Sequence, residues 1–212
     1  MKEFTVPMAL VDFIPVALFA LATIILMRDL YNKMSKGAFA LFAAGTIDVV
    51  CAGALKALHK LLYAAGVCDF QPLSAMFFPV QSIGFLLAGI GVIAMLVHKQ
   101  ISSTAAFAAV PPVFSGTFVF VGLMVTGVGL IDAALCVLSV KLKKPWLIAL
   151  FVVAFVCLLA MGYLSSKNFE QASMNWIAEG VNVVGQAALL IGVWLLHKNG
   201  LAELKLRGEE VA

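Results

Sequence analysis

Long apolar runs, separated by short polar segments, dominate the chain. A segment that crosses hydrocarbon must form a helix or join a closed barrel, because each unpaired backbone amide costs several kcal/mol there. Barrel strands alternate between apolar and polar residues over about ten positions. The run over residues 146–161 shows no such alternation. The pattern therefore predicts transmembrane helices and excludes a barrel.

Five runs are long enough to cross a hydrocarbon core of about 30 Å as single helices. They cover residues 8–27, 37–65, 73–97, 145–164 and 172–196. The first run continues to Arg28, past a signal-like Ala20-Leu21-Ala22, which indicates an uncleaved first helix. Residues 100–141 contain either one long helix or two short ones.

The positions of lysine and arginine decide between these alternatives, because cytoplasmic loops collect both residues. With two helices in residues 100–141, Lys2 and Lys167 are the only lysine or arginine residues of the loops and tails that face the outer side. The residues that then share the inner side are Arg28, Lys33, Lys36, Lys99, Lys141, Lys143, Lys144, Lys198, Lys205 and Arg207. The best six-span arrangement divides the same residues seven to five.

We therefore expect an all-α integral membrane protein, a bundle of seven transmembrane helices with its N-terminus outside and its C-terminus inside. Six spans are the alternative. Residues 1–212 would form one polytopic domain, with a short cytoplasmic tail over residues 199–212. The fourth helix, residues 100–114, contains Pro111-Pro112. It would pack inside the bundle or line a cavity, unless it is a re-entrant or surface segment.

Composition supports a membrane location. The chain is 63% hydrophobic and 12% charged with a mean hydropathy of +1.08, whereas globular chains carry roughly a quarter charged residues. The formal net charge of +3 is small, and the basic residues border the inner membrane surface, where they suit anionic lipid. We expect the plasma (inner) membrane as the location and the lipid bilayer as a partner, and no nucleic acid.

A short internal similarity links the third and seventh expected helices. Gln81, Gly84 and Gly91-Val92 recur as Asn182, Gly185 and Gly192-Val193, and both helices end in His-Lys. Helices four apart in a bundle run parallel, so a three-plus-one-plus-three arrangement of parallel repeats would explain the pattern. Chance is the competing explanation.

Polar side chains within the apolar runs are the candidate site. Asp48, Lys56 and His59 share one face of the second expected helix. The seventh expected helix has a second polar face, with Asn175, Glu179, Asn182 and Gln186.

Counting 1.5 Å per residue puts Lys56, Gln81 and Glu179 at similar depth. We expect a Lys56–Glu179 ion pair with Gln81, Asn182, and His59 or Asp12 around it, and Asp48 and Asp132 deeper. Lys60, His98 and His197 would snorkel to the membrane interfaces.

No motif identifies a reaction. The chain lacks HExxH, a Walker loop and a dinucleotide fingerprint, and its four cysteines form no disulfide framework. We expect no cofactor and no metal, and an enzyme is not favoured.

The favoured function is binding or transport of a small polar solute in an outward-facing intramembrane pocket. The alternatives are a membrane-embedded lipid-modifying enzyme and a sensor or partner subunit. The polar residues could also serve only as hydrogen-bonding links between helices. The oligomeric state stays open.

Overall fold

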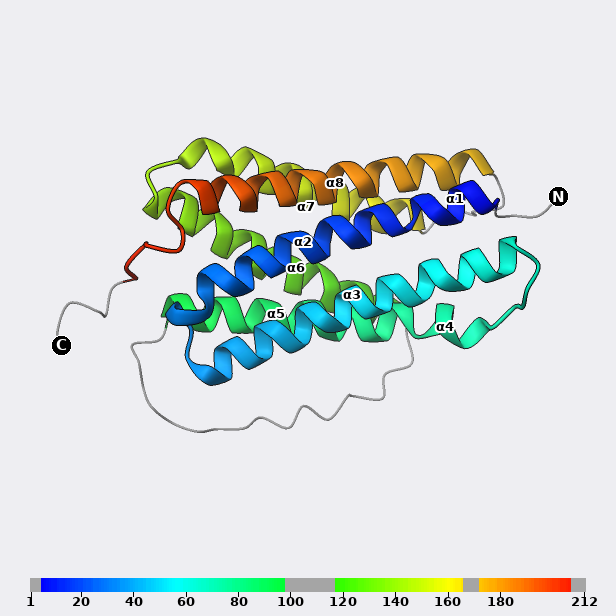
Figure 1. Cartoon of the computed structure of the whole chain (residues 1–212), viewed down its shortest axis with the longest axis horizontal. Helices are drawn as coiled ribbons and strands as arrows, with labels where there is room; N and C mark the ends of the chain where they lie inside the picture. Colours follow the sequence, from blue (N-terminus) through cyan, green and yellow to red (C-terminus); the bar gives the residue numbers. More distant parts are fainter. Residues whose placement is uncertain (1–4, 98–116, 166–171, 207–212) are drawn as a thin grey trace.

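The computed structural model describes residues 5–97, 117–165 and 172–206, and this part of the chain is helical, without a strand. Its helices lie side by side in one elongated bundle (Figure 1). The elements are α1 (Val6–Val11), α2 (Phe13–Leu30), η1 (Tyr31–Lys33), α3 (Lys36–Ala64), α4 (Gln71–Ala75), α5 (Phe77–Val97), α6 (Thr117–Lys141), η2 (Pro145–Leu147), α7 (Ile148–Ser165) and α8 (Ala172–Lys198).

Five helical segments of the described chain are long and apolar enough to cross a membrane. They are Val6–Lys33, Lys36–Ala64, Gln71–Val97, Val119–Lys141 and Met174–Lys198, and a shorter apolar helix covers Pro145–Met161. The predicted helical class is confirmed, whereas the seven-span count is not, because six long helices are described. The predicted fourth helix, residues 100–114, lies outside the described residues.

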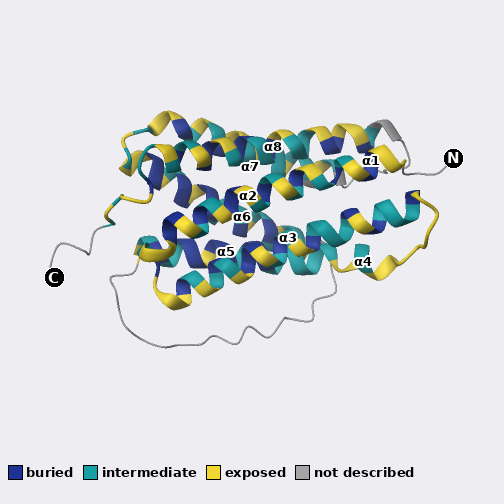
Figure 2. Ribbon diagram, viewed as in Figure 1, coloured by how far each residue is buried: buried dark blue, intermediate teal, exposed yellow. Residues whose placement is uncertain are grey.

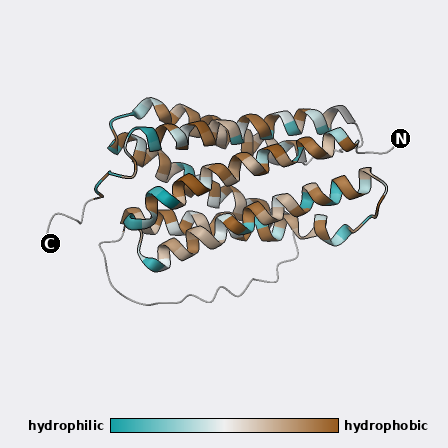
Figure 3. Ribbon diagram, in the orientation of Figure 1, coloured by the Kyte–Doolittle hydropathy of each residue, from teal (hydrophilic) through white to brown (hydrophobic). Residues whose placement is uncertain are grey.

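Apolar side chains occupy both the interior and the outer faces of the bundle. Phe42 and Phe151 are fully buried, while Ile24, Ile47 and Val156 are each more than half exposed. Figures 2 and 3 show the same mixture, since exposed helix faces are largely hydrophobic. Such faces suit a hydrocarbon solvent better than water.

Prolines explain two helix breaks at one end of the bundle. A proline has no N–H and its ring collides with the carbonyl four residues earlier. Helix α1 ends at Val11, four residues before Pro15, and α4 ends at Ala75, four residues before Pro79. Asp12 is the residue at the first of these breaks.

Glycines allow the central helices to approach closely. A Cβ atom added to Gly84 on α5 would lie 2.7 Å from the carbonyl oxygen of Gly45 on α3. One added to Gly89 would lie 2.7 Å from the carbonyl oxygen of Gly127 on α6. The backbone of α5 is therefore in direct contact with the backbones of α3 and α6.

Most of the described basic residues gather at one end of the bundle, which we call the basic end. Helices α2, α5, α6 and α8 end there, and α3 and α7 begin there (Figure 1). Arg28, Lys33, Lys36, Lys141 and Lys198 all lie at these helix ends. Helices α5 and α6 therefore run parallel, although they are consecutive long helices of the described chain.

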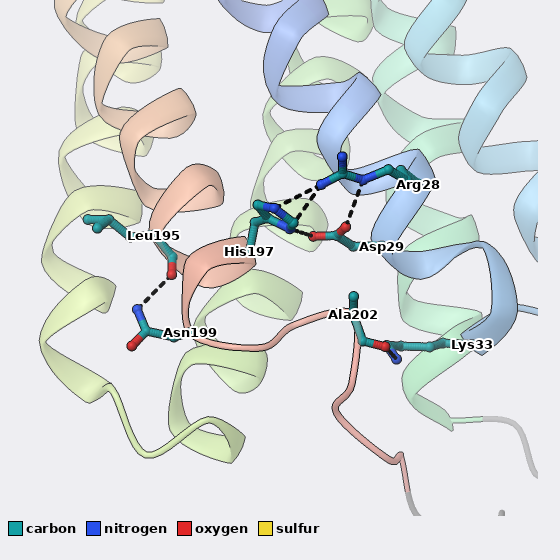
Figure 4. Close-up of polar contacts among 7 residues, drawn as sticks. All are labelled: Arg28, Asp29, Lys33, Leu195, His197, Asn199 and Ala202. Carbon is teal, nitrogen blue, oxygen red and sulfur yellow. Dashed lines mark hydrogen bonds and ion pairs between the residues drawn. The ribbon is translucent and has the colours of Figure 1, made fainter.

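A polar cluster joins α2 to α8 at the basic end (Figure 4). His197 Nδ1 lies 2.9 Å from Asp29 Oδ2, and Arg28 Nη2 lies 2.9 Å from His197 Nε2. Lys33 Nζ donates to the carbonyl oxygen of Ala202 at 2.6 Å. His197, which we expect to snorkel to the membrane interface, therefore also takes part in this cluster at the end of α8; His98 lies outside the described residues.

Candidate ligand-binding cavity

A cavity of about 450 Å³ lies between the helices, toward the end opposite the basic end. Its polar lining residues are Asp12, Lys56, His59, Lys60, Ser74, Gln81, Asn175, Glu179, Asn182 and Gln186. Aromatic and sulfur-containing side chains supply much of the rest, namely Phe19, Phe77, Phe78, Phe85, Met124, Cys157 and Met161. The cavity therefore combines a charged part with an apolar part.

Seven of the eight predicted site residues line this cavity. They are Lys56, His59, Gln81, Asn175, Glu179, Asn182 and Gln186. Asp48 does not line it, contrary to the expectation. Successive side chains of a helix point about 100° apart. Val49 lines the cavity, so the neighbouring Asp48 points in another direction, toward α5. Its Cβ lies 3.1 Å from the position that a Cβ on Gly84 would take.

Lys60 is the central cation of the charged part. Its Nζ lies 3.3 Å from Glu179 Oε1 on α8 and also forms an ion pair with Asp12 Oδ2 at the break between α1 and α2. The side chains of Lys60, Asp12 and Glu179 are only 12%, 6% and 11% exposed. One ammonium therefore ties together three separate parts of the bundle.

The predicted Lys56–Glu179 ion pair is wrong, since Glu179 pairs with Lys60. Lys56 and Lys60 are four residues apart, about 6 Å along a helix. Counting residues from the ends of the spans does not resolve differences in depth of one helical turn, so it does not distinguish Lys56 from Lys60. The expectation that Lys60 snorkels to the interface is also wrong, because its ammonium is buried between two carboxylates.

Lys56 contacts aromatic rings instead. Its Nζ lies 3.8 Å from the ring centroid of Phe77 and 5.8 Å from that of Phe78. These two rings meet edge to face, with centroids 5.2 Å apart. An ammonium over a ring face gains about 0.5–2 kcal/mol, depending on how far it is desolvated. No carboxylate of the described residues forms an ion pair with Lys56.

With Asp12 and Glu179 both ionised, three buried acceptor oxygens of the cavity lining meet no hydrogen-bond donor within the described chain: Asp12 Oδ1, Glu179 Oε2 and Gln186 Oε1. Leaving such an atom unpaired costs about 1–3 kcal/mol. A fourth, Asp132 Oδ2, lies on α6 away from the cavity lining. The three cavity oxygens are positions where a donor on a solute or a water would be stabilised.

A polar clamp closes the loop between α3 and α4 beside the cavity. His59 Nε2 lies 3.1 Å from Asp69 Oδ1, and Gln71 Nε2 donates to the same oxygen at 2.9 Å. The hydrogen bonds from His59 and Gln71 lower the pKa of the Asp69 carboxyl from its ordinary value. Asp69 therefore remains ionised and ties the end of α3 to the start of α4.

The fold and the cavity together define a class: in its described part, a helical bundle with helices long and apolar enough to cross a membrane, around an internal cavity with a charged part and an apolar part. Within the described ranges, no group of three His, Cys, Asp or Glu side chains could hold a metal ion. Comparison with known proteins finds no matching family model, no matching curated protein and no matching solved structure.

Proposed function

We propose that this chain is a solute-binding or transport protein of the plasma membrane, whose cavity receives a small polar solute from the outer side. The observation that carries the proposal is the set of three unpaired acceptor oxygens, on Asp12, Glu179 and Gln186, at one internal cavity. Buried polar atoms in native proteins are normally hydrogen-bonded. A bound solute would supply the missing donors.

The orientation follows from the charges. Lysine and arginine favour the cytoplasmic side of a membrane, and the basic end of the bundle contains Arg28, Lys33, Lys36, Lys141 and Lys198. The cavity lies toward the opposite end. It therefore faces outward in the proposed orientation.

Seven spans, with the N-terminus outside, are part of the same proposal. Helix α5 ends at the basic end, and α6 begins at the opposite end and runs parallel to α5. An additional crossing between these two parallel helices would give the odd number of spans that the distribution of basic residues favours.

A parallel repeat is supported by the neighbours of each helix. Helix α2 packs against α3 and α8, while α6 packs against α7 and α5. Helices α3 and α5 are neighbours, and so are α7 and α8. If α2, α3 and α5 correspond to α6, α7 and α8, these contacts map onto one another.

The glycines of the sequence similarity follow the same correspondence. Gly84 and Gly91 on α5 pack against α3, whereas Gly185 and Gly192 on α8 pack against α7. Gln81 and Asn182, which begin the two similar segments, both line the cavity. Transporters built from parallel repeats have their solute site between the two halves, and this arrangement supports transport over binding alone.

Uptake into proteoliposomes tests the proposal. The full chain would be reconstituted and offered radiolabelled amino acids, sugars and nucleosides one at a time. We expect saturable uptake or binding of at least one probe, weakened at least about tenfold by Glu179→Gln, since a charge-assisted hydrogen bond contributes about 1.5–3 kcal/mol. Asp48→Asn is the matched control, because Asp48 lies outside the cavity lining.

The proposal is wrong if no probe is bound or taken up by the folded protein. It is equally wrong if Glu179→Gln and Asp48→Asn have the same effect on every probe that is bound or taken up.

A further inference from the structure

We propose that the solute is a zwitterion with an apolar body, bound with its cationic group at Asp12 and Glu179 and its anionic group at Lys56. This inference rests on the proposed function and specifies its substrate class. An α-amino acid with a large apolar side chain has the required groups.

The carboxylates form the cation-binding part. Lys60 contributes one positive charge between Asp12 and Glu179, so the group holds one excess negative charge when both carboxylates are ionised. In this ionised form each carboxylate also keeps one buried oxygen that meets no donor from the described chain. A substrate ammonium would donate to these oxygens and neutralise the excess charge.

Lys56 forms the anion-binding part. Its ammonium lies over the Phe77 ring, and a ring face supplies no hydrogen-bond acceptor lone pair to match its N–H donors. A substrate carboxylate would accept from Lys56 without displacing an existing ion pair. Lys56, Asp12 and Glu179 line the same cavity, and Lys56 lies one helical turn from Lys60, which holds the two carboxylates, so one small zwitterion would reach both parts.

The aromatic lining accounts for the apolar body. Phe19 and Phe85 meet edge to face with ring centroids 5.6 Å apart, and both line the cavity with Met124. A sugar would place polar hydroxyls against these rings. An apolar side chain that packs against the rings would instead be removed from water, which is favourable. A cavity of about 450 Å³ falls within the range of small-molecule sites.

Binding to the purified full chain in nanodiscs tests the inference with two sets of probes. The first set is L-phenylalanine, its amide, which lacks the carboxylate, and 3-phenylpropionate, which lacks the amine. The second set is L-leucine, leucinamide and 4-methylpentanoate. We expect at least one amino acid to bind at least about tenfold tighter than both of its analogues, since each loses a charge-assisted hydrogen bond.

The variants assign each charge to its residue. Lys56→Gln should remove the preference for the amino acid over its amide, while the preference over the deaminated acid remains. Asp12→Asn should do the reverse. Lys198→Gln is the control for Lys56, because Lys198 also lies near an aromatic ring, 5.7 Å from the Trp194 ring centroid, but at the basic end. It should leave both preferences unchanged.

Two outcomes separate this inference from the proposed function. If a sugar or nucleoside binds in a Glu179-dependent manner and neither amino acid exceeds its analogues, the zwitterion assignment is overturned and the solute-binding function stands. If no probe of any class binds, both are overturned.

Discussion

Lys60 on α3 and Glu179 on α8 form an ion pair at 3.3 Å across 119 residues of sequence. Asp12, at the break between α1 and α2, shares the same ammonium. The three residues join both sides of the cavity close to the end that we assign to the outer side. Lys60 therefore links the stability of this part of the bundle to the solute site that we propose.

Replacement of Lys60 by methionine should destabilise the bundle strongly. The change keeps most of the side-chain volume but leaves Asp12 and Glu179 without a cation in a buried site. Removing one partner of a buried ion pair costs about 3–5 kcal/mol, so we expect a clear fall in the thermal midpoint of the detergent-solubilised protein.

The double variant Lys60→Met with Glu179→Gln should recover part of this loss, because one uncompensated charge is removed. Lys198→Met at the basic end is the control. An unchanged midpoint for Lys60→Met would show that the ion pair contributes nothing to stability.

The close contact of α3 with α5 predicts that Gly84→Ala destabilises the protein. The added Cβ would lie 2.7 Å from the Gly45 carbonyl oxygen, and this backbone atom cannot move aside alone. Gly122→Ala on α6 is the matched control, since a Cβ there meets nothing within 4 Å. Alanine is favoured over glycine in helices by about 1 kcal/mol.

Thermal unfolding of the two alanine variants should therefore change in opposite directions, with a lower midpoint for Gly84→Ala and an equal or higher one for Gly122→Ala. Equal midpoints would contradict the close packing of α3 and α5.

The clamp at Asp69 predicts a pH-dependent contribution to stability. Hydrogen bonds from His59 and Gln71 lower the pKa of Asp69 from 3.8, so the folded state favours the carboxylate. The stabilisation is fully present above pH 3.8 and is lost as pH falls through the lowered folded-state pKa. The midpoint difference between the wild type and Asp69→Asn should thus be largest at pH 5–6 and shrink toward pH 3, each measured by thermal unfolding.

Gln71→Leu gives an independent check, because it removes one of the two donors and should reduce the same difference. A difference that grows on acidification would have the wrong sign for a lowered pKa.

Local periodicity is sufficient to predict the long helices that the structure describes and most of the cavity lining. Polar residues three and four apart necessarily share a helix face, and buried polar faces turn toward one another. For this reason the spacing of Asn175, Glu179 and Asn182 is enough to assign them to one site. Their convergence with Gln81 requires only that helices of known direction pack together.

The identity of the ion pair cannot be predicted in the same way. Whether Lys56 or Lys60 meets Glu179 depends on tilt and sliding of α3 against α8, which amino-acid spacing does not specify. The prolines do carry a signal for the surroundings of the pair, because Pro15 and Pro79 mark helix breaks four residues earlier, at Val11 and Ala75. The first break lies next to Asp12.

The native cysteines offer a direct test of orientation. Cys68 is exposed in the loop between α3 and α4, so a membrane-impermeant maleimide should label it in intact cells if the cavity faces outward. Cys51 lies in the middle of α3, at membrane depth in the proposed bundle, where a polar reagent has no access. Cys136 and Cys157 are half-buried within α6 and α7. Because Cys157 lines the cavity, the test is made in a Cys157→Ser background, in which labelling should disappear when Cys68→Ser is added. Lys141→Cys in that double-serine background should react only after permeabilisation; the reverse pattern would place the cavity on the cytoplasmic side.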